Sequence, residues 1–366
     1  MQKEDIKIAI DARELKKDLT TGIKRFLKNF LDNIREKNIY LCIDKNTYID
    51  DYKDKFNILK INTGFTFYYD FFCLNNLIKK NDIDIFFSPY YKAPLFNKAR
   101  RIITIHDLHF LNPSLRKGLN RIKPFISYLK VLIKNSYKII TVSEFSKSQI
   151  IKNFSIDKDK IKVIYNGISN IFRKVPEDYK VKLKEKYSID FPYILYVGNI
   201  LPHKNLAGLI LAFNILQEKY KDYKLIIIAK RDKNFFTLSN LIKKLNLEKK
   251  IIFFDFVFDN DLVLFYNFSN IFVFPSFYEG FGLPPLEAIS CGATVACSYI
   301  EPLREILNNS VIYFDPYSFK DIAEKIDLVL SDDKLMIDLR KRAQEVIKRY
   351  KVDIFANSLL KEIYGI

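Results

Sequence analysis

Two carboxylates flank a glycine-containing loop in the carboxyl-terminal half of the sequence. Glu279 and Glu287 stand with seven residues between them, in the segment FPSFYEGFGLPPLEA. Gly280 and Gly282 allow backbone amides to approach a ligand closely, and helices favour proline at their first position, which predicts a helix opening at Pro285. Because the first N–H groups of a helix have no helical partner, the segment predicts a site for a phosphate or sugar oxygen. Glu279 then lies in the loop and Glu287 in the first helical turn. The alternative is an ordinary strand-to-helix turn with two solvated glutamates.

The elements that must position this loop follow an alternating pattern. Short apolar, β-branched runs alternate with longer amphipathic runs, which predicts βα repeats around parallel sheets. Strands are expected at 6–10, 39–43, 83–87, 102–105, 138–142 and 162–165, and in a second series at 193–197, 224–229, 251–254, 271–274, 294–296 and 311–314. Helices are expected at 22–35, 319–349 and 352–364.

The pattern restarts near the middle of the chain. A length of 366 residues is too great for one ordinary core and suits two α/β domains. A charged segment, 173–187, reads as a linker running into a helix. We therefore expect a first domain over 1–172, with 350–366 packing back onto it, and a second domain over 173–349. Open α/β sheets bind ligands beyond the carboxyl ends of their strands, so two doubly wound domains facing a cleft would hold a donor and an acceptor.

Composition narrows the class of protein. Hydrophobic residues make up 49% and charged residues 28% of the sequence, the balance of a globular chain. No apolar run approaches the roughly 18 residues of a membrane span, and the start of the chain lacks a signal-peptide pattern. A cytoplasmic location is therefore expected. The scattered cysteines are expected to be reduced core residues: Cys42, Cys73, Cys291 and Cys297.

A net charge of +17 admits three kinds of partner: nucleic acid, an anionic membrane surface, or phosphorylated substrates. A chain-wide bias toward lysine is the alternative. Residues 115–138 interleave basic with apolar and aromatic side chains, and Pro124 starts or kinks the expected helix. Such a helix can lie on the anionic inner face of a membrane, or it can have an apolar core face and a solvated basic face.

The sequence argues against a metal site, a dinucleotide-dependent oxidoreductase and a nucleic-acid-binding protein. Asp82 and Asp84 have the spacing of a metal-binding Asp-x-Asp, but an apolar run follows them, so we expect them to open a buried strand, and no metal site is predicted. No GxGxxG run follows a strand, which argues against a dinucleotide-dependent oxidoreductase. No nucleic-acid-binding module is recognisable, and no nucleic-acid partner is expected.

Five segments together resemble glycosyltransferase family four, a retaining family of the GT-B fold, over nearly the whole chain. They are TIHDL at 104–108, TVSEFS at 141–146, IYNGI at 164–168, VGNILPHKNL at 197–206 and the Glu279–Glu287 segment. The mannosyltransferase-like enzymes of bacterial O-antigen and capsule assembly are the most similar group. The resemblance implies an α/β protein with two Rossmann-like, doubly wound, parallel-sheet domains.

The resemblance also implies roles in donor binding. Glu287 would grip the donor ribose, and Glu279 would lie on the transferred sugar and its phosphate. Four loop residues would share the second role: Gly280, Phe281, Gly282 and Leu283. Lys204 would hold the diphosphate, within the entry loop that also contains Asn205.

The second basic position of the entry loop departs from the family. It is Asn199 here, and His203, Lys230 and Arg231 are its possible replacements. Ala229, at the end of the strand expected at 224–229, replaces an expected glycine. Asp255 replaces another, directly before Phe256 and Val257, which would flank the nucleotide base. These departures weaken any transfer of base specificity and keep an inactive scaffold as one alternative.

In the first domain, His106 matches a histidine that lies beside the reacting sugar. Asp107 would orient His106 or cap the following segment, and His109 is expected to be structural. Gly22, in TTGIKR, would bring backbone amides to the leaving phosphate.

The implied reaction is metal-independent hexosyl transfer with retention, without a cofactor. The donor is a nucleotide-sugar, GDP-mannose first and UDP-sugars next, and the acceptor is a growing, lipid-linked surface glycan. Positioned cations and amides would stabilise the leaving diphosphate, which would itself accept the acceptor's proton. The alternatives are an inactive GT-B scaffold, a basic nucleic-acid-binding protein, and a sugar epimerase or phosphorylase of the same shape.

Overall fold

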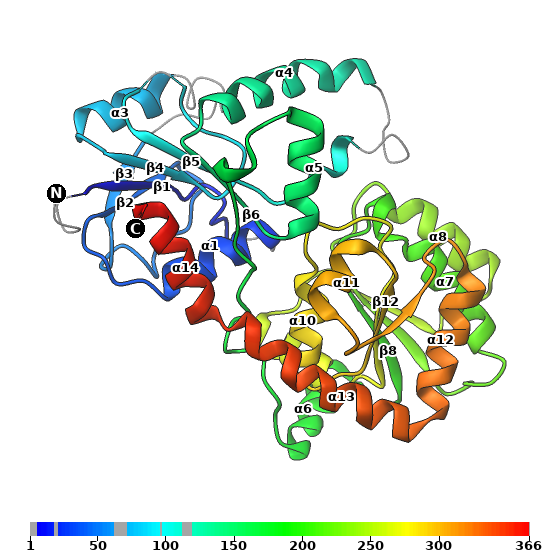
Figure 1. Ribbon diagram of the computed structural model, residues 1–366. Coiled ribbons are helices and arrows are strands. Elements are labelled where there is room, and N and C mark those ends of the chain that lie inside the picture. The colour runs from blue at the N-terminus through cyan, green and yellow to red at the C-terminus, as the bar shows by residue number, and fades with distance from the viewer. Residues whose placement is uncertain (1–5, 18–20, 62–71, 96, 112–118, 366) are drawn as a thin grey trace. The chain divides into compact units, whose positions relative to one another are not determined.

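The computed structural model describes residues 6–17, 21–61, 72–95, 97–111 and 119–365, which form two compact units (Figure 1). The first unit contains the described residues up to Gly167 and those from Val352 onward. The second unit is Ile168–Lys351.

These boundaries differ by a few residues from those expected at 172/173 and 349/350. The reason lies in the contacts of the connecting segment. The backbone N–H of Ile168 donates to the carbonyl of Tyr350 at 2.8 Å, and the ring of Phe172 packs 6.0 Å from that of Tyr266. Residues 168–172 therefore belong with the second unit.

The first unit is built on a parallel sheet, with seven strands among the described residues. The strands are β1 (Ile8–Asp11), β2 (Ile39–Ile43), β3 (Asn57–Lys60), β4 (Ile85–Ser88), β5 (Arg100–Ile105), β6 (Lys138–Thr141) and β7 (Ile161–Val163). The helices are α1 (Gly22–Asp32), α3 (Leu74–Lys80), α4 (Leu119–Asn135), α5 (Glu144–Phe154) and α14 (Val352–Tyr364). The sheet order is β3-β2-β1-β4-β5-β6-β7, with every pair parallel.

The second unit repeats this plan with six parallel strands in the order β10-β9-β8-β11-β12-β13. The strands are β8 (Tyr193–Val197), β9 (Lys224–Ile228), β10 (Ile251–Phe254), β11 (Ile271–Phe274), β12 (Val295–Ser298) and β13 (Ile312–Phe314). The helices include α6 (Val181–Tyr187), α7 (Leu206–Leu216), α8 (Phe235–Lys244), α9 (Asp259–Phe268), α10 (Leu283–Ser290), α11 (Glu301–Leu307), α12 (Phe319–Ser331) and α13 (Asp333–Ile347). Helix α7 packs against α12, and α10 packs against α13.

Each sheet has a point where the strand order reverses. In the first unit it lies between β1 and β4, and in the second between β8 and β11. Because all strands are parallel, their carboxyl ends share one edge of each sheet, and ligands of doubly wound folds bind at that edge, at the reversal point. The two α/β sheets predicted from the sequence are confirmed.

The last helix returns to the first unit. The ring of Phe355 on α14 packs edge-to-face on that of Phe26 on α1, with centroids 5.0 Å apart. Lys138 Nζ lies 2.6 Å from Glu362 Oε2, in a pair whose side chains are 14% and 29% exposed. Helix α14 is thus held by an aromatic contact and a partly buried ion pair.

Two elements differ from expectation. Strand β3 was not predicted. The single helix expected over 319–349 is two helices, because Asp332 interrupts it: its side chain accepts a hydrogen bond from the N–H of Leu335 and caps α13.

Helix α4 places its aromatic residues inward. The ring of Phe125 packs 5.2 Å from those of Tyr91 and Phe110, and Leu129 and Leu132 are fully buried. Lys123, Lys130 and Lys134 are exposed, and residues 112–118 lie outside the described residues. The described part therefore has the apolar core face and solvated basic face of an ordinary surface helix. Contact of α4 with a membrane stays a prediction. Such a contact would depend on the charge of the exposed lysines. Within the described ranges, none of the helices combines the length and the hydropathy of a membrane span.

Candidate active site

The loop after β8 is shaped by a buried tyrosine. Tyr196 is fully buried, and its hydroxyl donates to the carbonyl of Asn199 at 2.7 Å. A Cβ on Gly198 would lie 2.6 Å from that hydroxyl, so only glycine fits without a shift. Burial, and then the charge of Glu279, hold the pKa of Tyr196 well above its usual range. Tyr196 therefore remains a donor, and it leaves the side chain of Asn199 exposed at the edge of the sheet.

Asn205 ends this loop and starts the next helix. It adopts a left-handed conformation, with φ of 54°, between the short 3-10 turn Pro202–Lys204 and α7. Its side-chain oxygen accepts from the N–H of Gly208 at 3.2 Å, and its side-chain nitrogen donates to the carbonyl of Pro316 at 2.7 Å. The side chain of Asn205 is therefore buried and engaged within the fold, and it positions the loop.

The centre of the site is an ion pair between two strand-end loops. Lys204 Nζ lies 2.6 Å from Glu279 Oε1, and the two side chains are only 13% and 12% exposed. The carbonyl of His203 accepts from the N–H of Phe277 at 2.8 Å, which ties the loop after β8 to the loop after β11. A cation and a carboxylate thus meet at the reversal point of the second sheet, where a ligand is expected.

The glycine loop then enters α10. Gly282 is the N-cap, with φ of 111°, a conformation that L side chains rarely adopt. The helix begins at Leu283, so the expected start at Pro285 is wrong: Pro284 already lies in the first turn, where a missing N–H costs nothing. Glu287 consequently lies beyond the first turn, contrary to expectation.

Glu287 is almost completely buried, at 3% exposure. The hydroxyl of Tyr266 on α9, itself fully buried, donates to Glu287 Oε2 at 3.1 Å. A buried carboxylate needs such donors because burial disfavours its charged form. The neighbouring helix therefore fixes one oxygen of Glu287.

The carboxyl ends of β9 and β10 carry the remaining residues of the second unit. Val257 is buried, and Phe256 and Phe258 are exposed beside it with their rings 4.9 Å apart. Asp255 Oδ1 accepts from the N–H of Arg231 at 3.0 Å and lies 3.3 Å from its Nε. With strands spaced by about 4.8 Å, β10 and β11 are about 14 Å apart along this edge. Phe256 and Phe258 therefore lie at one end of the carboxyl edge of the second sheet, and the Lys204–Glu279 pair lies further along the same edge.

The first unit holds the two other predicted residues. The ring of His106, after β5, packs edge-to-face on Phe26 of α1 at 5.0 Å, and its Nε2–H donates to the carbonyl of Pro89 at 2.8 Å. Gly22 is the first residue of α1 and is exposed, and a Cβ added there would meet no atom of the described residues within 4 Å. Asp107 accepts from the backbone and Nδ1 of His109 at 3.0 and 2.6 Å. It therefore caps its own turn.

The burial of His106 predicts how the stability of the fold depends on pH. Burial lowers the pKa of His106, against the hydrogen bond to Pro89 and the charge of Asp107. Below the ordinary histidine pKa of 6.5, His106 binds a proton in the unfolded chain but stays neutral in the folded chain. The free energy of unfolding therefore falls as the pH drops, by at most about 1.4 kcal/mol per pH unit. Urea denaturation between pH 7 and 5 should show this slope reduced in His106→Gln and retained in His203→Gln. Equal slopes in wild type and His106→Gln would contradict the prediction.

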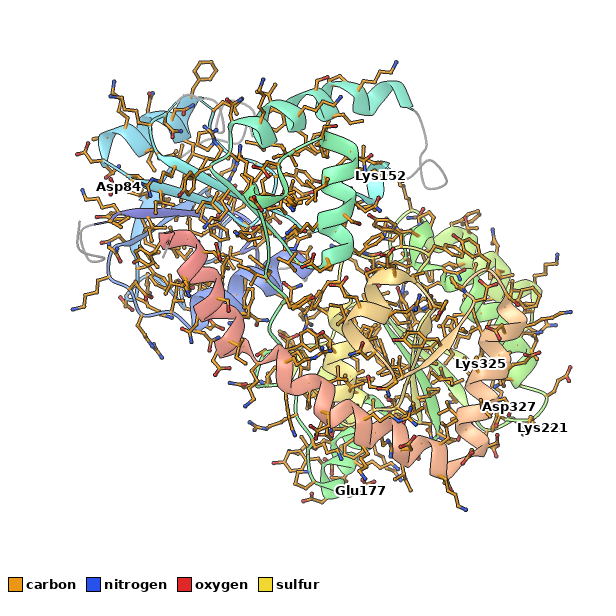
Figure 2. All side chains as sticks on the ribbon, in the orientation of Figure 1. Asp84, Lys152, Glu177, Lys221, Lys325 and Asp327 are labelled. Carbon is orange, nitrogen blue, oxygen red and sulfur yellow. The ribbon has the colours of Figure 1, made fainter. Side chains whose placement is uncertain are left out.

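The Asp82–Asp84 pair begins a strand, as expected. Asp84 Oδ2 accepts from the backbone N–H of Lys7 at 2.9 Å, just before β4 (Figure 2). In the described part of the chain, no group of three or more His, Cys, Asp or Glu side chains is placed to hold a metal ion.

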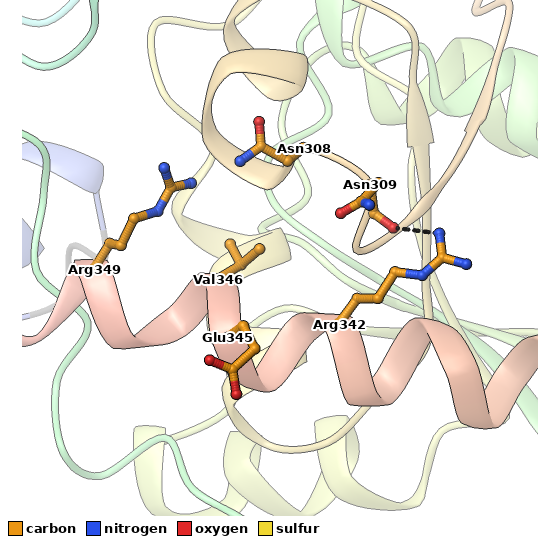
Figure 3. A pocket seen from close by; sticks show the side chains of 6 residues that line it. All are labelled: Asn308, Asn309, Arg342, Glu345, Val346 and Arg349. Carbon is orange, nitrogen blue, oxygen red and sulfur yellow. Dashed lines mark hydrogen bonds between the residues drawn. The ribbon is translucent and has the colours of Figure 1, made fainter.

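A surface hollow of the second unit lies away from these loops. Arg342 on α13 reaches back to the carbonyl of Asn309, and its Nη1 donates to that oxygen at 3.2 Å (Figure 3). The hollow is lined by Asn308, Asn309, Arg342, Glu345, Val346 and Arg349. None of the predicted site residues is among them.

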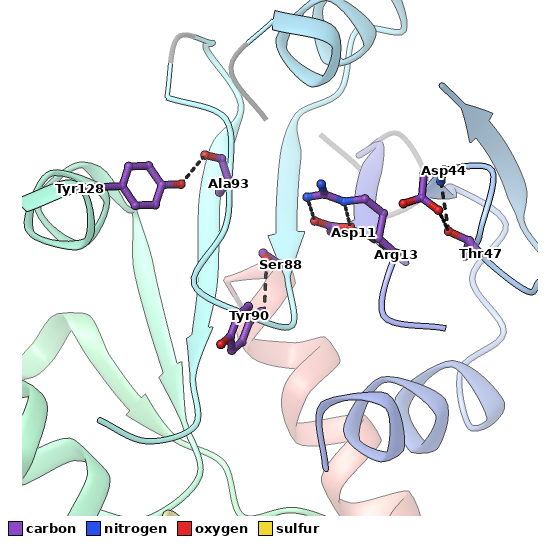
Figure 4. A network of polar contacts seen from close by, with 8 residues as sticks. All are labelled: Asp11, Arg13, Asp44, Thr47, Ser88, Tyr90, Ala93 and Tyr128. Atoms are coloured by element: carbon purple, nitrogen blue, oxygen red, sulfur yellow. Dashed lines mark hydrogen bonds and ion pairs between the residues drawn. The ribbon is translucent and has the colours of Figure 1, made fainter. Parts of the chain in front are cut away.

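Sequence reasoning missed two features of these edges. Tyr266 has no motif of its own, because it is one aromatic residue in an apolar helix. The second is the buried pair of Asp11, the last residue of β1, and Arg13, which follows the strand (Figure 4). Two charged side chains at the carboxyl end of an apolar run could have indicated it.

Two family descriptions match the chain. "Glycosyl transferases group 1" matches residues 180–346, and "Glycosyltransferase Family 4" matches residues 52–170. The first match contains the whole Lys204–Glu287 region, and the second contains His106.

The chain is also similar to individual glycosyltransferases. The chain is 32% identical over 251 residues to O-antigen chain mannosyltransferase B of Escherichia coli, covering 68% of this chain and 66% of that protein. It is 29% identical over 252 residues to the serotype-specific mannosyltransferase WbdA of Escherichia coli, covering 67% of this chain and 31% of that protein. The chain thus spans about two thirds of the first relative and about a third of the second.

A solved structure gives the fold. Anabaena Alr3699/HepE in complex with UDP and glucose superposes with a TM-score of 0.80 at 16% identity, covering 99% of this chain and all of that one. With two Rossmann-like sheets, a matching glycine loop and both family regions, the chain belongs to the glycosyltransferases of family 4, with the GT-B fold.

Proposed function

We propose that the protein transfers a hexose, with retention, from a nucleotide-sugar to a growing, lipid-linked surface glycan, without a metal ion. The observation that supports this best is the Lys204–Glu279 pair at 2.6 Å, beside the amino-terminal end of α10. Lys204 and the loop amides supply positive charge where a leaving diphosphate would develop negative charge. Glu279, the partner of Lys204, lies close to the position of the diphosphate and would orient the transferred sugar.

The remaining roles follow the family resemblance. Glu287 binds the donor ribose, and the loop residues 280–283 contact the sugar and its phosphate. Val257 and Phe256 flank the base. The leaving phosphate accepts the proton of the acceptor hydroxyl. The roles of Gly22 and His106 in the first unit stay predictions from the resemblance.

Mannose is the proposed hexose and GDP the proposed carrier. The names of the relatives support mannose. The exposed carboxylate of Asp255 supports guanine, because guanine presents two adjacent donors, N1–H and the 2-amino group, whereas uracil presents one N–H. UDP-sugars are the second candidate, since one structural relative is a complex with UDP.

The test is a thermal-shift panel of GDP, UDP, ADP and dTDP with their sugars, in EDTA. A ligand that binds only the native state raises the midpoint, by an amount equivalent to about 2.7 kcal/mol at 100 times its Kd. We expect a rise with GDP and GDP-mannose that survives EDTA and fades in Glu287→Ala. A rise that requires a divalent metal would contradict metal independence, and no rise with any nucleotide would contradict the donor site.

Tyr266 is expected to act on donor binding through Glu287. In Tyr266→Phe the carboxylate loses a hydrogen bond of the kind worth about 1.5–3 kcal/mol, so the donor KM should rise by about tenfold or more. Because ribose is bound alike in ground and transition states, kcat should change little. Tyr193→Phe is the matched control, since this buried hydroxyl donates to the carbonyl of Phe265 at 2.9 Å, away from the site. An equal rise of KM in both variants would show that the effect is only structural.

Asp255 is expected to set the preference for the base. Replacing it in Asp255→Gly removes the acceptor for two guanine donors, at a half-exposed site, so the ratio of UDP to GDP dissociation constants should fall by about tenfold. Isothermal titration with both nucleotides measures this ratio. Asp232→Ala, in the neighbouring loop, should leave it unchanged, and an unchanged ratio in Asp255→Gly would refute the assignment.

A further inference from the structure

An exposed aromatic stack lies beside the Lys204–Glu279 pair of the second unit. The rings of Phe277, after β11, and Tyr317, after β13, are stacked with their centroids 4.8 Å apart and their planes inclined by 23°. Tyr317 is 76% exposed, whereas Phe277 is half-buried behind it. Because Phe277 covers one face of the Tyr317 ring, this large exposure means that the other face is open to solvent.

Hydrogen bonds hold the loop of Tyr317 in place. The N–H of Tyr317 donates to Asp315 Oδ1 at 2.9 Å, and the N–H of Asp315 donates to Asp321 Oδ2 at 2.7 Å. The carbonyl of Pro316 accepts from the side-chain nitrogen of Asn205 at 2.7 Å. The backbone of residues 315–317 is therefore fixed before any ligand arrives, which lowers the entropy that binding would cost.

The same contacts place the stack next to the reacting groups. Asn205, which binds the loop of Tyr317, directly follows Lys204 in the chain. Phe277 lies two residues before Glu279, so their Cα atoms are at most about 7 Å apart. A ligand on the open face of Tyr317 would thus lie close to the hexose held by Lys204 and Glu279.

The stack suits a sugar ring. Its open face is one aromatic ring wide, and the hydroxyl of Tyr317 is at the rim. The C–H face of a pyranose covers such a surface while its hydroxyls stay in water, and tyrosine serves sites where one side is apolar and the other wet. A lipid chain would need a longer apolar surface, because its binding grows with the area buried. The nucleotide base is assigned to Phe256 and Val257, which follow β10, at the opposite edge of the sheet from β13.

We propose that the open face of Tyr317 binds a sugar ring of the growing glycan, next to the ring that receives the hexose. The proposal rests on the proposed function. It gives the second unit a part in acceptor binding, through a ring that does not react. Phe277 is the support that keeps the tyrosine ring in position.

The sequence contains no tryptophan, which allows a site-specific probe. Tyr317→Trp keeps an aromatic surface and introduces a single indole, whose fluorescence reports contact at this position. The full chain is titrated with mannotriose, in the presence of the nucleoside diphosphate selected by the thermal-shift panel. We expect a saturable blue shift of the emission. Phe236→Trp is the matched control, because Phe236 on α8 is 72% exposed in the same unit, and its emission should not change.

Saturation-transfer NMR measures the affinity in variants without the probe. The dissociation constant of mannotriose should rise about tenfold in Tyr317→Ala, which removes the aromatic surface, and should stay within about threefold of wild type in Tyr317→Phe, which keeps it. Because the side chain of Tyr317 is exposed, neither change should disturb the fold, and the nucleotide-induced thermal shift should remain.

The outcomes separate this proposal from the proposed function. Weaker mannotriose binding in Tyr317→Ala, with the nucleotide-induced shift intact, supports it. Unchanged affinity in Tyr317→Ala, or no binding of mannotriose to the wild-type chain, overturns it. An emission shift of Tyr317→Trp with GDP-mannose in place of mannotriose would assign Tyr317 to the donor, and a shift only with phosphatidylglycerol vesicles would assign it to a membrane; both overturn the proposal. Absence of any nucleotide shift in the wild-type chain refutes the donor site instead, and the response to mannotriose still decides the role of Tyr317.

Discussion

Lys204→Met should lower kcat by about 10²–10³, the effect of removing one preorganised group that stabilises developing charge. Methionine keeps much of the length and volume of the side chain and removes its charge. In the structure the Lys204 ammonium lies 2.6 Å from Glu279 Oε1 and 5.5 Å from the centre of the Phe274 ring, with 13% of the side chain exposed. A cation held so firmly needs little reorganisation when charge develops on a nearby diphosphate. Steady-state transfer assays with GDP-mannose would measure the loss.

The control is a lysine in an ion pair outside the site. Lys219 Nζ lies 2.5 Å from Asp327 Oδ1, and both side chains are substantially exposed. Figure 2 labels Asp327 on α12. Lys219→Met should leave kcat unchanged. The double variant Lys204→Met, Glu279→Gln tests whether an unpaired carboxylate alone repels the donor. Recovery of activity in the double variant, or a kcat for Lys204→Met within about threefold of wild type, would contradict the role of Lys204 in charge stabilisation.

The second sheet could be predicted strand by strand, because each strand is a short apolar run bounded by polar turns. Strand β8, for example, is buried at all five positions. Strand β3 carried no such signal. It lies at the edge of the first sheet, with both ends exposed and its middle half-buried, so its sequence needs neither a continuous apolar run nor a clear alternation. The break between α12 and α13 was missed because one capping aspartate, without glycine or proline, makes it.

The sequence predicted which loops form the site, but it did not predict which side chains contact each other. Lys204 and Glu279 are 75 residues apart, and they meet because β8 and β11 are neighbours at the reversal point. Alternating apolar runs do not specify the order of strands in a sheet. Tyr266 was beyond reach for the same reason, since only the packing of α9 against α10 brings its hydroxyl to Glu287. Residue types thus indicated the chemistry, and strand order decided which groups meet.

The pair of Asp11 and Arg13 should carry the largest effect on stability. Removing one partner of a buried ion pair leaves an uncompensated charge, which typically costs about 3–5 kcal/mol. Arg13→Met should therefore destabilise the first unit by that amount, because the Asp11 carboxylate at the end of β1 loses the guanidinium and retains the backbone N–H of residue 13, at 3.2 Å, as a donor. Urea denaturation followed by circular dichroism would measure the loss. Hydrogen exchange read by mass spectrometry would localise it to the first unit.

Two comparisons separate the lost charge pair from lost packing. Replacing both partners by apolar side chains removes the unpaired charge as well, so Asp11→Leu, Arg13→Met should recover most of the loss. Lys28 forms a pair with Asp32 on α1 with 44% and 40% of the side chains exposed, and Lys28→Met should cost only about 0.3–0.5 kcal/mol, as solvated pairs on one helix do. If Arg13→Met and the double variant were equally unstable, the loss would come from packing at the end of β1. The charge of the pair would then not matter for stability.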